Sequence, residues 1–363
     1  MVARLAVMAG GTGGHVFPAL AVAEYLRGQG AEVFWIGTRS GMESCLVPEH
    51  GFEMEEIAIE GVRGKGGLQW LKAPFRLASA FGQARAILRR RRPQVVLGLG
   101  GFVSGPGGLA ARALGIPLVI HEQNCVPGLT NRWLAWIATQ VFESFPGSFP
   151  AARRAILTGN PVRRAILDLP PPAERLAGRS GPIRLLVVGG SLGAQALNET
   201  VPQALARLPA ERRPLVRHQA GERTLELARA AYRNAGVAAE VVAFMRDMAE
   251  AYAWADLVVC RAGALTVAEL AAAGIGSILV PYPFAVDDHQ VGNARSLSEV
   301  GAARLILQRE LTPAHLADTL NELCVDRTRL LAMAESARRR AQPEATERIA
   351  RTCLELSTRG TPS

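Results

Sequence analysis

Residues 5–15, LAVMAGGTGGH, and residues 185–194, LLVVGGSLGA, each place a glycine-rich loop directly after a short apolar run. A strand that ends in such a loop before a helix presents backbone amides at the positive end of the helix dipole, which favours binding of an anion. Two such stretches, one in each half of the chain, predict two nucleotide-fold domains that face a shared cleft, with a phosphate site on each side.

Neither loop is the fingerprint of a dinucleotide-binding protein or of a P-loop ATPase. The pattern Gly-x-Gly-x-x-Gly, begun at Gly11, has Val16 at its third glycine, and no Gly-Lys-Ser/Thr follows either loop. Such glycines are also compatible with tight turns and close helix–strand packing alone. His15 favours a functional interpretation of the first loop, because an imidazole at the start of a helix transfers protons near neutral pH.

Short apolar strands alternate with helical stretches along the whole chain. This alternation predicts right-handed βαβ units and a parallel sheet in each half. The expected strands are 5–9, 33–37, 95–99, 118–121 and 140–143, then 184–188, 215–219, 240–244, 257–260, 277–280 and 303–307. The proline run 170–172 and the stretch 178–182 predict a linker near 160–182. Ligands of such folds bind at the carboxyl ends of the strands, where the glycine loops lie.

The composition predicts a globular cytoplasmic protein of two domains. The chain has 363 residues, of which 49% are hydrophobic and 20% charged. No apolar run approaches the roughly 18 residues that span a bilayer, and the chain begins with a strand rather than a signal peptide. The five cysteines form no Cys-x-x-Cys pair, which predicts reduced thiols rather than a disulfide framework or a zinc site.

The net charge of +9 predicts a surface that attracts nucleic acid, anionic lipid or a phosphorylated substrate. The densest basic run, 89–92, is followed by Pro93, so we interpret it as the C-terminus of a helix. Because no nucleic-acid-binding motif accompanies this run, nucleic acid is not an expected partner.

The stretch 64–82 has an apolar helical face edged with positive charge. Leu68, Leu71 and Phe75 share one stripe of the helix, and Trp70 lies beside it. The face is completed by Leu77 and Phe81, and the cations are Lys65, Lys72 and Arg76. This pattern suits a helix that lies on a membrane surface, but a core-packing helix has it too, and the pattern alone slightly favours the core.

Further polar and glycine-rich segments follow other strands. The loop 100–108 is rich in glycine, and 121–124 is His-Glu-Gln-Asn, four polar side chains that core packing seldom requires together. After 257–260, Thr266 is expected to cap a helix that carries Glu269. The Glu269 carboxylate either favours the helix N-terminus or binds a pair of ribose hydroxyls. The sequence Asp-Asp-His-Gln, 287–290, precedes another helix.

No metal site is expected. The six histidines are dispersed without a His-x-x-x-His pair, and no Asp-x-Asp occurs to hold a divalent ion on a nucleotide diphosphate. The charge of a departing diphosphate would then be stabilised by helix dipoles and by Ser191 and Arg163.

Seven segments occur in an order that resembles one enzyme family. They are 10–18, 100–108, 121–124, 159–163, 189–194, 263–270 and 287–290. With them the chain resembles, over essentially its whole length, glycosyltransferase family 28, the bacterial lipid I N-acetylglucosaminyltransferases. The resemblance implies an α/β GT-B fold, in which two Rossmann-like parallel-sheet domains hold the active site in the cleft between them. It also implies an N-terminal acceptor- and membrane-binding domain, 1–162, onto which a helix at 343–358 packs back, and a C-terminal UDP-GlcNAc-binding domain, 163–342.

The same resemblance implies a hexosyltransferase of peptidoglycan synthesis that needs no cofactor. It would transfer GlcNAc, with inversion, from UDP-GlcNAc to the C4 hydroxyl of MurNAc in lipid I, forming lipid II. The expected partners are UDP-GlcNAc, undecaprenyl-linked lipid I, anionic inner-membrane lipids and other cell-wall and division proteins. The expected location is peripheral, on the cytoplasmic face of the inner membrane, with 64–82 as the membrane contact.

Site residues carried over from the family fall into three sets. The catalytic candidates are His15, as general base or for orienting the acceptor, and Glu122. Those expected to bind the donor are Thr12, Gly13, Gly14, Asn124, Arg163, Ser191, Phe244, Met245, Ala264, Leu265, Thr266, Glu269 and Gln290. Those expected to bind the acceptor pyrophosphate are Gly11, Thr12, Gly14, His15, Ser104 and Gly105. The expected membrane contacts are Leu68, Trp70, Leu71, Lys72 and Phe75.

The sequence departs from the family pattern at two positions and leaves other functions open. Phe102 replaces a frequent tyrosine, which removes a phenol from this loop, and Ala262 replaces a frequent serine. A glycolipid glycosyltransferase and a UDP-GlcNAc 2-epimerase are alternatives on the same fold. A basic nucleic-acid-binding protein is an alternative that rests on charge alone.

Overall fold

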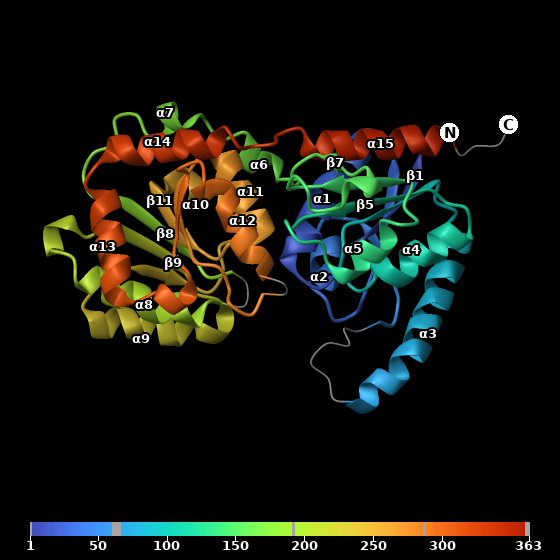
Figure 1. Cartoon of the computed structure of the whole chain (residues 1–363), viewed down its shortest axis with the longest axis horizontal. Coiled ribbons are helices and arrows are strands. Elements are labelled where there is room, and N and C mark those ends of the chain that lie inside the picture. Colours follow the sequence, from blue (N-terminus) through green and yellow to red (C-terminus); the bar gives the residue numbers. More distant parts are fainter. Residues whose placement is uncertain (1, 60–66, 191–192, 286–287, 360–363) are drawn as a thin grey trace. The chain divides into compact units, whose positions relative to one another are not determined.

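The computed structural model describes residues 2–59, 67–190, 193–285 and 288–359, which form two compact units (Figure 1). Unit 1 comprises Met1–Arg163 and Gln342–Ser363, and unit 2 comprises Arg164–Ala341. Each unit contains one parallel sheet with helices packed on it, which confirms the expected α/β class with two Rossmann-like domains.

Unit 1 is built on a seven-stranded sheet of order β3-β2-β1-β4-β5-β6-β7, in which every neighbouring pair is parallel. Its strands are β1 (Arg4–Met8), β2 (Glu32–Gly37), β3 (Glu53–Glu56), β4 (Val95–Gly98), β5 (Leu118–Glu122), β6 (Gln140–Glu143) and β7 (Ile156–Leu157). The expected strands are present within one residue at each end. β3 and β7 were not expected, because β3 has no apolar pattern and β7 is only two residues long.

The helices of unit 1 cover both faces of its sheet. They are α1 (Gly13–Gly28), α2 (Glu43–Glu49), α3 (Gly67–Arg91), α4 (Ser104–Ala113), α5 (Leu129–Leu134) and α15 (Ala345–Arg359). Successive side chains of β1 point to opposite faces, so Val7 packs in the cluster beneath α1 and α15, and Ala6 packs in the cluster beneath α3 and α4. The C-terminal helix α15 therefore contributes Ile349 and Cys353 to the same core as α1.

Unit 2 is built on a six-stranded parallel sheet of order β10-β9-β8-β11-β12-β13. Its strands are β8 (Arg184–Val188), β9 (Leu215–Gln219), β10 (Glu240–Val242), β11 (Leu257–Cys260), β12 (Gly276–Leu279) and β13 (Ala303–Leu305). Its helices are α6 (Arg164–Leu167), α7 (Pro172–Arg175), α8 (Gln195–Ala206), α9 (Leu225–Ala235), α10 (Met248–Trp254), α11 (Ala264–Ala273), α12 (His289–Ser298), α13 (Pro313–Cys324) and α14 (Arg327–Arg338). All six expected strands are present, with ends shifted by at most two residues.

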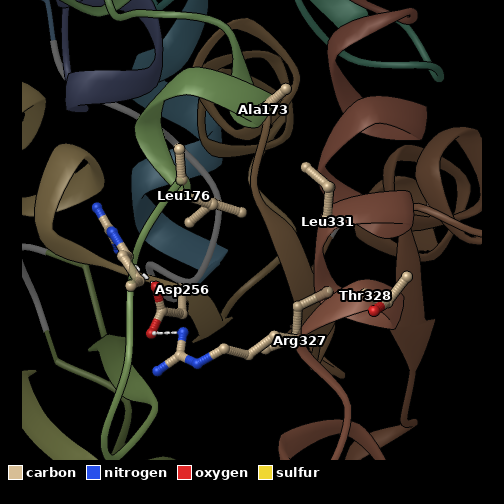
Figure 2. A pocket seen from close by; sticks show the side chains of 9 residues that line it. Ala173, Leu176, Asp256, Arg327, Thr328 and Leu331 are labelled. Atoms are coloured by element: carbon tan, nitrogen blue, oxygen red, sulfur yellow. Dashed lines mark hydrogen bonds and ion pairs between the residues drawn. The ribbon is translucent and has the colours of Figure 1, made fainter.

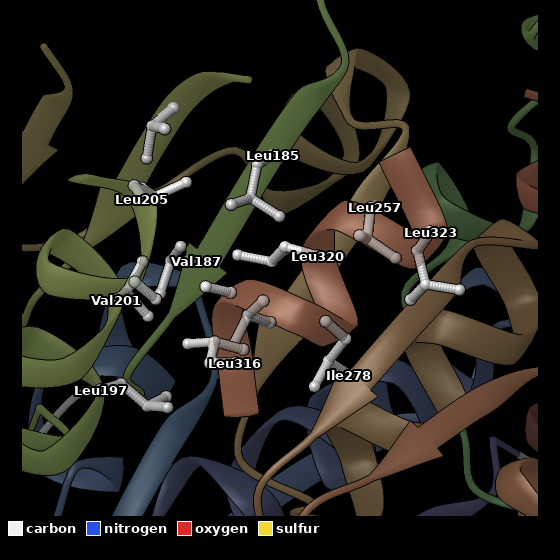
Figure 3. Close-up of a cluster of buried hydrophobic side chains, with 14 of the residues drawn as sticks. Leu185, Val187, Leu197, Val201, Leu205, Leu257, Ile278, Leu316, Leu320 and Leu323 are labelled. Carbon is white, nitrogen blue, oxygen red and sulfur yellow. The ribbon is translucent and has the colours of Figure 1, made fainter. Parts of the chain in front are cut away.

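The core of unit 2 lies where α8 and α13 pack on the sheet (Figure 3). Leu316, Leu320 and Leu323 recur on one face of α13 at the spacing of an amphipathic helix. They belong to the same buried cluster as Leu185 of β8 and Ile278 of β12. β8 and β11, the two central strands of the sheet, both contribute side chains to this core.

The strand order places both glycine-rich loops at equivalent positions. In each sheet the first strand lies between the second strand and a later one: β1 between β2 and β4, and β8 between β9 and β11. The order therefore reverses at β1 and at β8, and ligands of such sheets bind at this reversal, beyond the carboxyl ends of the strands. The loops after β1 and β8 lie at these two positions.

The segment expected to be a linker is instead packed on unit 2. Arg175 donates hydrogen bonds to the carbonyl oxygens of Ala273 and Gly274, and Arg179 pairs with the buried carboxylate of Asp256. Arg327 of α14 pairs with the same carboxylate at 3.1 Å. Arg179, Asp256 and Arg327 line a cavity of about 230 Å³ at α7 and α14, whose other walls are largely apolar (Figure 2).

Candidate functional site

A buried carboxylate, which the sequence analysis did not identify, forms a hydrogen bond to the first glycine loop. Glu43, at the start of α2, is fully buried and accepts hydrogen bonds from the Gly11 amide at 2.9 Å and from the Thr38 amide and hydroxyl at 3.0 and 2.7 Å. The Gly11 amide, expected to bind the acceptor pyrophosphate, is therefore already paired with an anion. Because Gly13 and Gly14 lie in the first turn of α1, their amides have no intrahelical acceptor.

A second loop of unit 1 packs directly on the first. A Cβ atom at Gly101 would lie 2.4 Å from the Gly10 carbonyl oxygen, and one at Gly100 would lie 2.9 Å from the His15 ring. Both positions have positive φ, so glycine is required for conformation as well as for space. The second half of the expected loop 100–108 is helical, because α4 begins at Ser104.

Ser104 does not present its hydroxyl to a ligand. This side chain is fully buried and donates to the Gly100 carbonyl oxygen at 2.7 Å. The Ser104 hydroxyl is therefore engaged within the loop, and the expected contact of Ser104 with the acceptor pyrophosphate stays a prediction that only its backbone amide could fulfil. The backbone amides of Ser104 and Gly105 lie in the first turn of α4, where an anion remains favourable.

The His15 ring is fixed by a hydrogen-bonded chain that begins in β5. Its Nδ1 lies 2.9 Å from the Gln123 side-chain oxygen, and the Gln123 side-chain nitrogen lies 3.1 Å from Nδ1 of His121. His121 is fully buried, and burial lowers its pKa to about 4, so its ring is neutral near pH 7. Because Nδ1 of His15 faces Gln123, Nε2 is the ring nitrogen that lies on the side away from Gln123.

Both carboxylate oxygens of Glu122 accept hydrogen bonds from nearby backbone and side-chain donors. Glu122 is 2% exposed, and its carboxylate accepts from the Asn124 amide at 3.0 Å, the Gly128 amide at 3.2 Å and the Asn131 side-chain nitrogen at 2.9 Å. Four donors in total surround its two oxygens, since the Asn124 side chain also donates. This geometry does not support Glu122 as a catalytic base, and it orders the turn that carries Asn124.

A cation lies close to the N-terminus of α1. The Arg163 guanidinium carbon is 5.1 Å from the centre of the Phe17 ring, and Phe17 in turn packs beside Gly13. Arg163 therefore adds positive charge near the free amides of Gly13 and Gly14. Thr12 is the exposed N-cap residue of the same helix, and its carbonyl oxygen accepts from the His15 amide at 3.0 Å.

The second glycine loop, in unit 2, is described only in part. Ser191 lies outside the described residues, as does Asp287. Gly193 has positive φ, and a Cβ atom there would lie 2.5 Å from the Ala220 carbonyl oxygen, so the loop passes close to the end of β9. α8 starts two residues later, at Gln195. This is the strand–loop–helix arrangement expected of a phosphate site.

A second helix N-terminus in unit 2 follows β11. The N-cap residue of α11 is Gly263, so the expected capping role of Thr266 is wrong. The first-turn amides of Leu265 and Thr266 have no intrahelical acceptor, and Ala264 is buried at the helix start. The neighbouring loop is held by Asn293 of α12, whose side-chain nitrogen donates to the Ala262 carbonyl oxygen at 3.2 Å.

Glu269 lies one turn into α11 and has a partner that the sequence did not reveal. Its side chain is 5% exposed, and its carboxylate accepts a hydrogen bond from the hydroxyl of Tyr252 in α10 at 3.2 Å. Tyr252 is itself buried. A fixed carboxylate of this kind can accept from two adjacent hydroxyls of a sugar.

The remaining candidates of unit 2 lie on the loop after β10 and at the start of α12. Phe244 is 45% exposed, and the Met245 amide donates to the Gln219 side-chain oxygen at 2.9 Å, so that amide is engaged. The Gln290 side-chain oxygen accepts from the Tyr282 amide at 2.9 Å, which ties the start of α12 to the loop after β12. Among the described residues, no group of three or more His, Cys, Asp or Glu side chains is placed to hold a metal ion.

Unit 1 has exposed aromatic side chains on α3, on α5 and just after α5. α3 packs on α4, and α4 packs on α5. Phe75 is 79% exposed, and Trp133 and Trp136 are 70% and 69% exposed. The side chains of Leu68, Trp70, Leu71 and Lys72 lie outside the described residues. Within the described part of the chain, no helix is long and apolar enough to cross a membrane.

Comparison with known proteins gives consistent matches in both halves of the chain. Residues 5–143 match the glycosyltransferase family 28 N-terminal domain, and residues 184–349 match the glycosyltransferase family 28 C-terminal domain. A protein of Marinobacter nauticus named "UDP-N-acetylglucosamine--N-acetylmuramyl-(pentapeptide) pyrophosphoryl-undecaprenol N-acetylglucosamine transferase" is 57% identical over 98% of both chains.

Two further matches agree with this one. A protein of the same name from Nitrosococcus oceani is 57% identical over 98% of this chain and 99% of its own. The crystal structure of Acinetobacter baumannii MurG has a TM-score of 0.82 and 42% identity, and the match covers 97% of this chain and 99% of that one.

Proposed function

The chain belongs to glycosyltransferase family 28, and we propose that it transfers N-acetylglucosamine from UDP-N-acetylglucosamine to N-acetylmuramyl-(pentapeptide) pyrophosphoryl-undecaprenol, lipid I. The product is lipid II, a precursor of peptidoglycan. The observation that carries the proposal is 57% identity, over 98% of both chains, to a transferase of that name.

Unit 2 is proposed to bind the donor. The Glu269 carboxylate, oriented by Tyr252, would accept from the two ribose hydroxyls of UDP. The first turn of α11 and the loop 189–194, with Ser191, would bind the diphosphate, and the backbone near Phe244 and Met245 would contact uracil. Ala264, Leu265, Thr266 and Gln290 would surround the sugar.

Unit 1 is proposed to bind the acceptor. Its pyrophosphate would lie on the amides of Gly14 and Gly105, in the first turns of α1 and α4. Nε2 of His15 would take the proton of the MurNAc C4 hydroxyl as that oxygen attacks the anomeric carbon of GlcNAc. The bond from that carbon to UDP breaks with its electron pair on UDP, which inverts the anomeric centre.

Contact with a membrane is proposed for the α3–α4–α5 surface, which we define by Phe75, Leu77, Leu109, Leu129, Trp133 and Trp136. The N-terminal part of α3 projects from unit 1, and residues 74–79 are all exposed (Figure 1). Arg76 lies within this exposed part of α3. Apolar and aromatic side chains edged by cations suit the surface of an anionic leaflet, where an undecaprenyl-linked acceptor presents its pyrophosphate.

The test of the proposed function is turnover of UDP-GlcNAc with a short-chain lipid I analogue. We expect UDP release and a disaccharide product only when the acceptor is present. A UDP-GlcNAc 2-epimerase would instead change the donor without acceptor. A galactosyltransferase would prefer UDP-galactose in a competition between donors. Either result would overturn the proposal.

A further inference from the structure

We propose that Gln123 is a positioning residue for His15: its side-chain amide, oriented by buried His121, holds the His15 imidazole in the tautomer that bears its proton on Nδ1 and leaves Nε2 basic. The catalytic consequence rests on the proposed function, in which His15 takes the acceptor proton. The tautomer itself follows from hydrogen-bond partners within unit 1.

The chain of hydrogen bonds is anchored by a group that can only accept. Nε2 of His121 lies 3.0 Å from the Gly159 carbonyl oxygen, so this nitrogen must carry a proton. The Ser144 hydroxyl oxygen, at 3.2 Å from the same nitrogen, can serve as a second acceptor. Because full burial keeps the His121 ring neutral, its single proton is on Nε2, and Nδ1 presents a lone pair.

The anchor determines which way the Gln123 amide points. Nδ1 of His121 accepts, so the atom 3.1 Å from it must be the Gln123 side-chain nitrogen, which donates. The opposite orientation would place a carbonyl oxygen against a lone pair. The Gln123 side-chain oxygen therefore faces Nδ1 of His15 at 2.9 Å.

The last link determines the protonation of His15. A side-chain carbonyl oxygen only accepts, so Nδ1 of His15 donates and, in the neutral ring, Nε2 has the lone pair. Gln123 is 1% exposed, and its side-chain amide bonds to both His15 and His121, so the amide has little freedom to turn. Gly100 packs directly against the His15 ring, so that a Cβ atom at this position would lie 2.9 Å from it.

The physical consequence concerns the population of the reactive form. An imidazole without this partner samples both tautomers and several ring orientations, and only some of these present a basic Nε2. If the reactive tautomer and orientation are already held before the acceptor binds, the free energy of selecting them no longer adds to the activation barrier of the transfer. Gln123 thereby acts on turnover without touching either substrate.

The first test observes the tautomer directly. The full chain, labelled with 15N-histidine, contains six histidines, and a His15→Asn variant identifies the signals of His15 by NMR. We expect the neutral His15 ring of the free protein to carry its proton on Nδ1 and none on Nε2. A protonated Nε2 with a bare Nδ1 would overturn the inference, whatever the activity of the protein.

The second test compares three variants. Gln123→Met has a similar length but no acceptor, so we expect mixed tautomers at His15 and a kcat lower by about 10- to 100-fold, with the KM for UDP-GlcNAc unchanged. Gln123→Glu keeps an acceptor for Nδ1 of His15 but loses the donor to Nδ1 of His121, so it should retain the His15 tautomer and a kcat between those of Gln123→Met and the wild type. Gln140→Met is the matched control. Gln140 starts β6, at the amino ends of the strands, whereas Gln123 follows the carboxyl end of β5, and the Gln140 side-chain nitrogen donates to the Val141 carbonyl oxygen.

The outcomes separate this inference from the proposed function. A lower kcat in Gln123→Met with unchanged His15 signals would mean that the role is merely structural, and the inference would be wrong. Mixed tautomers in Gln123→Met together with nearly full turnover in His15→Ala would leave the positioning intact and remove His15 as the base. If Gln123→Met does not fold, the wild-type spectrum and Gln123→Glu still decide the tautomer.

Discussion

Buried polar side chains shape the glycine loop of unit 1 at the scale of single residues. Glu43 pairs with the Gly11 amide and with Thr38, while Gln123 pairs with His15. A Cβ atom at Gly41 would collide with the Glu43 carboxylate at 2.0 Å, and one at Gly37 would lie 2.8 Å from its side chain. Gly37 and Gly41 therefore leave the space that the Glu43 side chain occupies, a role separate from any approach to a ligand.

Replacing Glu43 should loosen this loop and destabilise the protein. Glu43→Ala removes the acceptor for three donors around a buried site, and each unsatisfied buried group costs about 1–3 kcal/mol. We expect a loss of roughly 2–5 kcal/mol in the free energy of unfolding in urea. Glu49→Ala, at the exposed end of the same helix, is the control and should change stability little. Equal effects of the two variants would show that the Glu43 bonds contribute nothing.

Replacing Glu269 should weaken donor binding more than it slows the chemical step. Each charge-assisted hydrogen bond contributes about 1.5–3 kcal/mol, so Glu269→Ala should raise the Kd of UDP-GlcNAc at least tenfold in calorimetry. Tyr252→Phe keeps the carboxylate but removes the donor that orients it, and it should raise the Kd by a smaller factor. An unchanged Kd in Glu269→Ala would remove this residue from the ribose site.

At the scale of elements, the described side chains of α3 form an exposed segment followed by a buried C-terminal half. Its C-terminal half is a core helix, since Ala80, Ala84 and Leu88 are buried against the sheet. It ends at Arg91, before Pro93, as expected, and Arg90 and Arg91 pair with Glu55 and Glu53 of the edge strand β3. Residues 74–79 are exposed instead, which leaves Phe75 available to a membrane.

The α3–α4–α5 surface predicts peripheral, partly salt-sensitive membrane binding. Burial of a large apolar side chain contributes about 1.5–3 kcal/mol, and each nearby cation adds about 1 kcal/mol on an anionic leaflet. Phe75→Ser with Trp133→Ser should reduce sedimentation with anionic liposomes and activity on a long-chain acceptor, but spare activity on a water-soluble one.

A matched control for this surface uses exposed apolar residues of unit 2. Leu215 and Val325 are 53% and 67% exposed, and Leu215→Ser with Val325→Ser should leave liposome binding unchanged. If the Phe75/Trp133 variant unfolds, or binds vesicles as well as the wild type, the membrane contact lies elsewhere.

Helix termini are expected to replace a metal ion in stabilising the departing UDP. α8 and α11 both begin directly after a loop at the carboxyl end of a strand, and their dipoles favour a diphosphate. With Ser191 and Arg163 as further partners, turnover should persist in EDTA at a rate close to that in its absence. Loss of turnover on chelation, restored by magnesium, would contradict the metal-free mechanism.

At the scale of the whole molecule, each unit is completed by segments distant in sequence. α15 joins the core of unit 1 beside α1, although more than 300 residues separate them along the chain. In unit 2, Arg179 and Arg327 converge on Asp256, which is 2% exposed (Figure 2). This ion-pair cluster connects the segment after α7 to the start of α14.

Removing Asp256 should destabilise unit 2 as a whole. Asp256→Ala would leave two arginines around a largely buried site without their anion, and breaking a buried pair typically costs 3–5 kcal/mol. We expect a loss of about that size in the free energy of unfolding. Asp168→Ala is the control, because Asp168 forms an exposed pair with Arg164 and should cost less than about 1 kcal/mol. A loss for Asp256→Ala as small as that of the control would contradict the structural role of the cluster.

The sequence by itself determined the two parallel-sheet domains, eleven of the thirteen described strands within about two residues, and the glycine-rich loops at the ends of β1 and β8. These features depend on local periodicity and on glycines at the ends of apolar runs, which act over a few residues. The family and its reaction also followed from motif order along the chain, in agreement with the matches over 5–143 and 184–349.

Only the tertiary structure decided which polar groups meet. His15 and Gln123 are 108 positions apart, Gly11 and Glu43 are 32 apart, and Tyr252 and Glu269 lie on different helices. The sequence shows that Glu122 and Ser104 are polar. It does not show that their side chains form hydrogen bonds with other groups inside the protein. A buried hydrogen bond depends on the position and direction of both partners, and the packing of the sheet sets these across long separations in the chain.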